Sequence, residues 1–156
     1  MFYFSTNPKK LYYRKRPCHL WFWIYNKNML NLNSVMIGTM QSDVMAKFYE
    51  RVFGKKPEME EGGWHGWIVG NSFFSVGEHS EMTGSAKDPG RVMFNLETSE
   101  VEVEFLRISK IDGARVVKEP YEMGGGLIAT IADPDGNYFQ LMTPWEMSEK
   151  KETLPN

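Results

Sequence analysis

The feature of this sequence that most constrains its fold is an internal duplication. Residues 34–49 align with residues 91–106 without a gap, at a constant spacing of 57 residues. Five aligned pairs are identical and a sixth is conservative: Val35/Val92, Met36/Met93, Ser42/Ser99, Val44/Val101, Phe48/Phe105 and Asp43/Glu100. A repeat of this kind predicts two copies of one supersecondary unit, which build their core together.

Each copy is predicted to open with a strand followed by a helix. Short apolar runs at 33–39 and 91–97 are typical of buried strands. Ser42 and Ser99 follow these runs and are expected to be helix N-caps, and Ser99 with Glu102 forms a capping-box pattern. One apolar stripe then marks each amphipathic helix: Val44, Phe48 and Val52 in the first, and Val101, Phe105 and Ile108 in the second. Gly54 and Gly113 are placed to end the helices.

The remainder of each copy predicts further strands. The expected strands are 64–69 and 72–77 in the first copy, and 114–119, 127–132 and 137–142 in the second. The sequence Asp-Pro-Asp-Gly at 133–136 predicts a hairpin turn, and Gly70-Asn71-x-Phe73 aligns with Gly136-Asn137-x-Phe139. The predicted fold class is therefore α+β, with two tandem βαβββ modules that form a cup-shaped mixed sheet around a central cavity.

The expected domain is residues 30–146, with module one at 30–88 and module two at 90–146. Residues 147–156 are a polar tail, and residues 1–29 are a basic and aromatic leader that contains a short apolar run. The run is shorter than the ~18 residues of a spanning helix and lacks a small-residue cleavage site. Three interpretations stay open: a secretion signal, a membrane-surface segment, or a non-native leader. We favour the third, and expect the leader to contribute little to stability.

Composition restricts the partners and the compartment. The net charge is only −2 and both signs are interspersed, so no nucleic-acid partner is expected. Cys18 is the single cysteine, which excludes an intrachain disulfide and favours a reducing, cytoplasmic location. No membrane partner is expected. The aromatic share of 14% exceeds what a small core readily buries, which predicts a homodimer.

Two segments carry a family resemblance. Residues 46–54 and 131–141 resemble the first-helix and last-hairpin signatures of the vicinal oxygen chelate superfamily, which includes glyoxalases, bleomycin-resistance proteins and extradiol dioxygenases. The resemblance extends over about 30–145. It implies an eight-stranded cup, in which most enzymes of the family hold a divalent metal. It also implies that two histidines and one or two glutamates, from the first and last strands of each module, bind this metal.

In this sequence those metal positions carry unsuitable residues. The resemblance places them at Ser34, Arg91, Gln140 and Phe74. If the register of the last strand in module one slips by one, Ser75 takes the place of Phe74. A guanidinium is permanently charged, a phenyl ring has no donor atom, and serine and glutamine offer only neutral oxygens. We therefore expect no metal at this position and no cofactor.

The expected function is the binding of an anionic or hydrogen-bonding aromatic small molecule. The predicted ligand-binding residues are Ser34, His65, Trp67, Phe74, Arg91 and Gln140. For Arg91, an exposed position beside Asp88 is an equal alternative. Catalytic residues are not assigned.

Two other functions stay open. The first is a metal-dependent lyase, isomerase or dioxygenase with an atypical site built from His65, His79 and Glu78. The second is an interaction module, in which the leader binds a partner and the domain is a scaffold.

Overall fold

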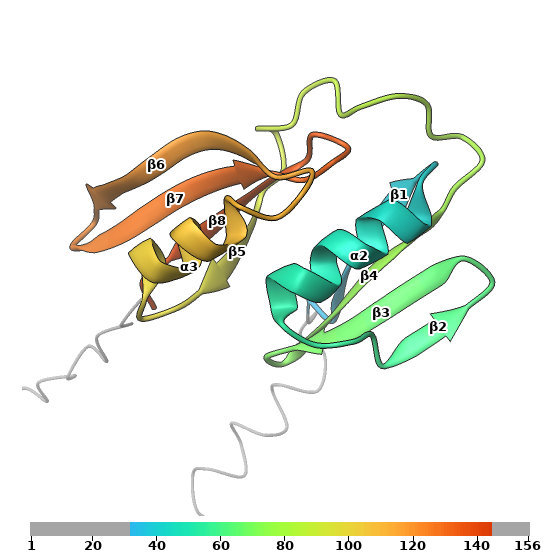
Figure 1. Ribbon diagram of the computed structural model, residues 1–156, viewed down its shortest axis with the longest axis horizontal. Coiled ribbons are helices and arrows are strands. Elements are labelled where there is room, and N and C mark those ends of the chain that lie inside the picture. The colour runs from blue at the N-terminus through green and yellow to red at the C-terminus, as the bar shows by residue number, and fades with distance from the viewer. Residues whose placement is uncertain (1–31, 145–156) are drawn as a thin grey trace, which may run out of the picture. The chain divides into compact units, whose positions relative to one another are not determined.

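The computed structural model describes residues 32–144, which form two four-stranded sheets with one helix against each (Figure 1). Module one contains β1 (Ser34–Thr39), α2 (Ser42–Phe53), β2 (Met59–Glu61), β3 (Trp64–Val69) and β4 (Ser72–Glu78). Module two contains β5 (Phe94–Glu97), α3 (Val101–Ile108), β6 (Arg115–Met123), β7 (Gly126–Ala132) and β8 (Tyr138–Met142). The α+β class and the two tandem βαβββ modules are confirmed.

Both sheets have the same topology. Their strand orders are β1-β4-β3-β2 and β5-β8-β7-β6. The first strand of each module pairs in parallel with the last, and the other pairs are antiparallel. The parallel pair follows from the helix that separates β1 from the rest of its sheet, since parallel neighbours need a crossover connection. The short strand β2 was not predicted from the sequence.

The predicted serine N-caps are wrong. Helices α2 and α3 are capped by Gln41 and Glu100, and neither cap makes a side-chain hydrogen bond. Instead, the backbone N–H of Gln41 donates to the Thr39 hydroxyl at 3.0 Å, and that of Glu100 donates to the Thr98 hydroxyl at 3.1 Å. In each module a threonine at or just after the end of the first strand thus accepts a hydrogen bond from the backbone N–H of the N-cap residue. The predicted capping box is not formed.

The predicted C-terminus is right for one helix. Gly54 ends α2 in the left-handed conformation, with φ of 66°, as expected. Helix α3 ends earlier than Gly113, because Ser109 is its C-cap.

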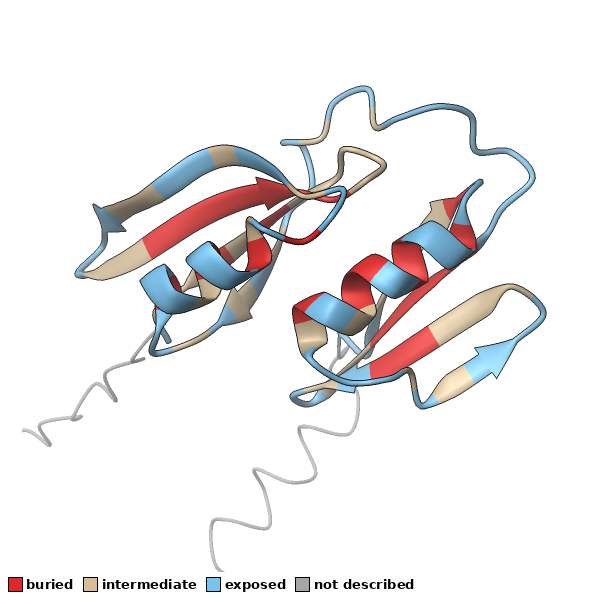
Figure 2. Cartoon of the chain, in the orientation of Figure 1, coloured by how far each residue is buried: buried red, intermediate tan, exposed pale blue. Residues whose placement is uncertain are grey.

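The two modules share one hydrophobic core. Figure 2 shows buried residues on both helices and on strands of both sheets. The predicted stripe of α3 is buried in full, whereas Val44 of α2 is 48% exposed. The buried stripe of α2 runs instead through Met45, Phe48, Tyr49 and Val52. The centre of the Tyr49 ring lies 4.6 Å from that of Phe74 and 6.3 Å from that of Phe139, so this side chain packs near buried residues of both sheets.

Polar contacts also join the modules. The buried Tyr49 hydroxyl donates to the Asp133 carboxylate in the turn before β8, at 2.9 Å. The Arg107 guanidinium of α3 donates to the carbonyls of Arg51 and Val52 at 2.6 and 2.8 Å. These carbonyls belong to the last turn of α2, where the helix dipole favours a cation. The helix-covered side of each sheet is therefore committed to the shared core.

Candidate functional site

The sides of the sheets that the helices leave uncovered are the surfaces open to a ligand. Side chains alternate between the two sides of a strand, and directly paired residues lie on the same side. In module one the pairs Trp64/Gly77, Gly66/Ser75 and Ile68/Phe73 lie on the uncovered side. Met36 of β1 and Ile68 of β3 are 59% and 56% exposed there. We call this side the module-one face, and its chemistry is apolar and aromatic.

Glycines allow two aromatic rings to lie against the backbone of the module-one face. A Cβ atom on Gly77 would lie 2.2 Å from the Trp64 ring, and one on Gly66 would lie 2.2 Å from the Phe73 ring. Any larger residue at either glycine would push the ring away from the sheet. The two rings thus pack closely on the sheet, and glycine in a strand interior commonly marks such a close approach.

The uncovered side of module two carries a row of four polar side chains. Lys118 pairs with Thr130, Thr130 pairs with Gln140, and Gln140 pairs with Asn95. The row therefore crosses β6, β7, β8 and β5 in order, and we call it the polar row. The Gln140 amide donates to the Thr130 hydroxyl at 3.1 Å. The row contains one cation and no carboxylate.

The polar row lies beside a hollow and beside aromatic rings. The hollow has a volume of about 400 Å³ and is lined by residues 123–128 and 142–144. Its lining includes Ile128 and Met142, which pair with each other next to the row. On β6, the Lys118 ammonium lies 5.6 Å from the centre of the Tyr121 ring. This side of module two thus combines a hydrogen-bonding row with a recess that apolar side chains line in part, a combination typical of small-molecule sites.

Two of the predicted ligand-binding residues lie on uncovered sides, one in each sheet. Ser34 is exposed on β1, and Gln140 is half-buried in the polar row. Phe74, by contrast, is 4% exposed and packs in the core. Its neighbour Ser75 lies on the uncovered side, which is the one-residue slip in register that the sequence left open. The physical reason is that Phe73 lies on the module-one face, whereas its motif counterpart Phe139 lies in the core.

Trp67 and His65 lie on the covered side of β3. Trp67 is fully buried, and its indole N–H donates to the Lys55 carbonyl at 3.1 Å. A ligand on the module-one face has no access to this ring. His65 is half-buried, and its Nε2 lies 3.7 Å from the Asp43 carboxylate without a hydrogen bond to any described residue.

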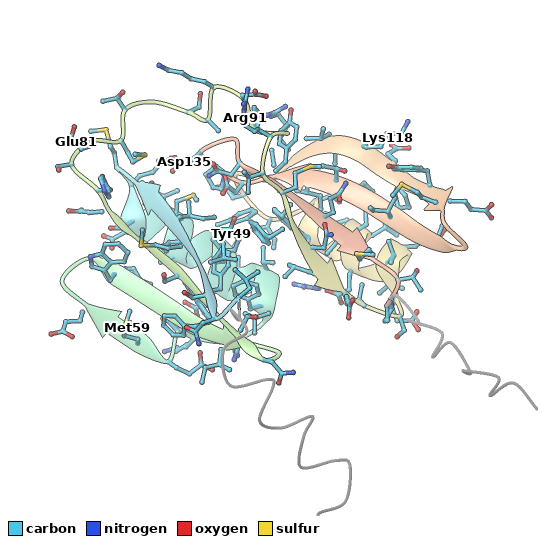
Figure 3. All side chains as sticks on the ribbon, turned by 180° about the vertical axis from the view of Figure 1, so that it is seen from behind. Tyr49, Met59, Glu81, Arg91, Lys118 and Asp135 are labelled. Carbon is cyan, nitrogen blue, oxygen red and sulfur yellow. The ribbon has the colours of Figure 1, made fainter. Side chains whose placement is uncertain are left out.

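Arg91 lies outside the strands, on the segment that precedes β5. Its guanidinium donates to the Asp88 carboxylate through Nε and Nη2, at 3.0 and 2.8 Å. The side chain is 78% exposed, and Figure 3 shows it on the linker, away from Lys118 on β6. The structure thus gives Arg91 the exposed position beside Asp88 and not a place beside Gln140.

The residues at the family's metal positions do not fit a divalent cation. Ser34, Ser75 and Gln140 carry neutral oxygens, and the Gln140 amide nitrogen faces Thr130 as a donor. Between residues 32 and 144, no group of three or more His, Cys, Asp or Glu side chains could hold a metal. His65, His79 and Glu78 therefore do not form such a group.

Comparison with known proteins identifies the family. A profile of the Glyoxalase/Bleomycin resistance protein/Dioxygenase superfamily matches residues 31–141. No curated protein matches the chain. Among the described residues, no helix has the length and apolar character that crossing a membrane requires.

Solved structures share the fold. A glyoxalase-related enzyme from Fulvimarina pelagi is 17% identical with a TM-score of 0.63, over 74% of this chain and 89% of that one. A glyoxalase/bleomycin resistance protein/dioxygenase family enzyme from Burkholderia phytofirmans PsJN is 24% identical with a TM-score of 0.59, over 73% and 98%. A glyoxalase/bleomycin resistance protein from Albidiferax ferrireducens T118 is 18% identical with a TM-score of 0.60, over 72% and 98%. The chain belongs to the glyoxalase/bleomycin resistance protein/dioxygenase superfamily, the vicinal oxygen chelate proteins that its two signatures resemble.

Proposed function

We propose that this chain is a small-molecule-binding protein that works without the divalent metal used by most enzymes of its family. The observation that carries the proposal is the polar row. At the position where the family places a glutamate, Gln140 instead donates a hydrogen bond to Thr130. A neutral amide engaged in this way supports hydrogen-bonding recognition of a ligand and gives a cation no charge to bind.

A second copy of the chain completes the site in this proposal. The covered sides of both sheets are committed to one core, so the two uncovered sides cannot also pack on that core. Closing a cup over a ligand then requires the module-one face of one protomer to cover the polar row of its partner. Exposed Met36 and Ile68 support such an interface, because contiguous apolar surface commonly marks a contact. We propose a homodimer on this basis. A cytoplasmic location is proposed from the single cysteine, which suits a reducing compartment.

The test combines metal analysis with ligand screening. Protein purified without a histidine tag is analysed for transition metals, and its ¹⁵N-labelled form is screened by NMR against a library of small aromatic compounds. The proposal predicts less than ~0.1 metal ion per chain, together with ligand-dependent shifts of amide signals in β7 and β8. One tightly held metal per chain would contradict it. The absence of ligand-induced shifts in these strands would also contradict it.

A further inference from the structure

We infer that Lys118 is the anchor for a negatively charged group, and that the ligand class is small aromatic carboxylates. The inference rests on the proposed function and extends it from an unspecified small molecule to one chemical class. It starts from the position of Lys118 at the β6 end of the polar row, opposite the buried Thr130.

The Lys118 ammonium is available to a ligand. It makes no ion pair with any residue between 32 and 144, and its neighbour is the Tyr121 ring at 5.6 Å. Tyr121 pairs with Ile128, which lines the hollow beside the polar row. The ammonium therefore lies on the side of the row that faces the hollow, where the apolar part of a ligand would sit.

Two cations lie on the uncovered side of β6. Arg115 is a second cation on the uncovered part of β6, and its guanidinium lies 5.9 Å from the centre of the Tyr138 ring. The exposed Glu119 follows Lys118 in an irregular part of β6 and has no strand-pairing partner, and the acid that the pairing pattern places on this side is Glu97 on β5, opposite Met142. Strands β5 and β6 are three strand spacings apart, which is about 14 Å. Glu122 pairs with Leu127, whose side chain packs against the core, so it does not offset Lys118.

The neighbouring polar groups suit a carboxylate that is anchored at Lys118. The Thr130 hydroxyl accepts from Gln140, which leaves its own hydrogen free to donate. One carboxylate can then accept from the Lys118 ammonium and from this hydroxyl. Charge-assisted hydrogen bonds of this type are the stronger class. The apolar side chains of Ile128 and Met142 and the Tyr121 ring surround the space for an aromatic body.

The experiment compares two probes of equal shape and different charge, 2-naphthoate and 2-naphthamide. Each is titrated into the ¹⁵N-labelled full chain, and the dissociation constant is taken from the amide signals of β7 and β8. We expect 2-naphthoate to bind roughly 10-fold more tightly than 2-naphthamide, as hydrogen bonds to charged groups imply. The variant K118Q should abolish this preference and K118R should retain it. The matched control K56Q removes an exposed lysine elsewhere and should change nothing.

The possible failures are distinguishable. Equal binding of the two probes at β7 and β8, or an unchanged preference in K118Q, would overturn the role of Lys118 while leaving the proposed function intact. Binding of neither probe at these strands would overturn both. Because K118R retains the charge, a loss of preference in K118Q and K118R alike would also overturn the charge argument.

Discussion

Replacing Tyr49 with phenylalanine should weaken the fold by removing one hydrogen bond between the modules. The Tyr49 side chain is fully buried, and its hydroxyl lies 2.9 Å from the Asp133 carboxylate. Burial, followed by the neighbouring Asp133 charge, raises the pKa of Tyr49 well above its ordinary value, so the hydroxyl stays protonated as a donor. A hydrogen bond to a charged group contributes about 1.5–3 kcal/mol. Asp133 keeps its bonds from Asp135 and Asn137, so the loss should stay within this range.

Urea unfolding measures this loss directly. The phenylalanine ring keeps the contact with Phe74 at 4.6 Å, so the variant isolates the hydroxyl group. The midpoint should fall while the m-value stays constant, because the exposed area on unfolding does not change. Tyr121→Phe is the matched control, since its hydroxyl contacts only the Met123 sulfur at 3.8 Å, and it should cost less than ~0.5 kcal/mol. Equal losses in the two variants would refute the reasoning that the Tyr49 hydrogen bond joins the modules.

Three further predictions follow from the site and the core. The double variant Asn95→His with Gln140→Glu should gain affinity for zinc, measured by calorimetry, because the two residues are paired neighbours. The double variant Arg91→His with Gln140→Glu should not gain it. Equal zinc affinities in the two variants would contradict the pairing of β5 with β8. Light scattering at micromolar concentration should give a dimer mass for the wild type and a monomer mass for Ile68→Lys; a monomeric wild type would contradict the interface. Burial raises the pKa of Asp133 above its ordinary 3.8, although bonds from Asn137 and Tyr49 oppose the rise. The folded state therefore favours the protonated acid, and the free energy of unfolding of the wild type, relative to Asp133→Asn, should fall as pH rises from about 4 through the folded pKa. A relative stability that grows with pH would contradict this.

Much of the fold could be predicted from the sequence because its signals are local. The predicted strand at 64–69 has the observed bounds, and those at 72–77, 127–132 and 137–142 differ by one residue. The buried stripe of α3 follows directly from its spacing. The helix caps could not be predicted in this way, because the threonines that satisfy the turns precede the serines that fit the capping pattern.

The site was harder to predict because it depends on which side of a strand each residue occupies. A slip of one residue moves a whole strand's side chains to the opposite side. The Gly-Asn-x-Phe alignment contains such a slip, so it predicts Phe74 for a position on the uncovered side that Ser75 occupies in the structure. Lys118 was missed because its place in the polar row depends on irregular pairing between β6 and β7. The sequence shows only that Lys118 is a lysine within the predicted strand 114–119.

The shared core also separates the residues that hold this protein together from those that can change what it binds. Tyr49 of α2 and Phe139 of β8 stabilise the fold on the covered side of the sheets, while Lys118 and Asn95 lie on the uncovered side and carry little of the packing. The two sets lie on opposite sides of the sheets, so the energetic effects of substitutions at well-separated positions should add. A duplicated protein built in this way can acquire new ligands by changing one surface of one half, while the other half and the core remain as they were.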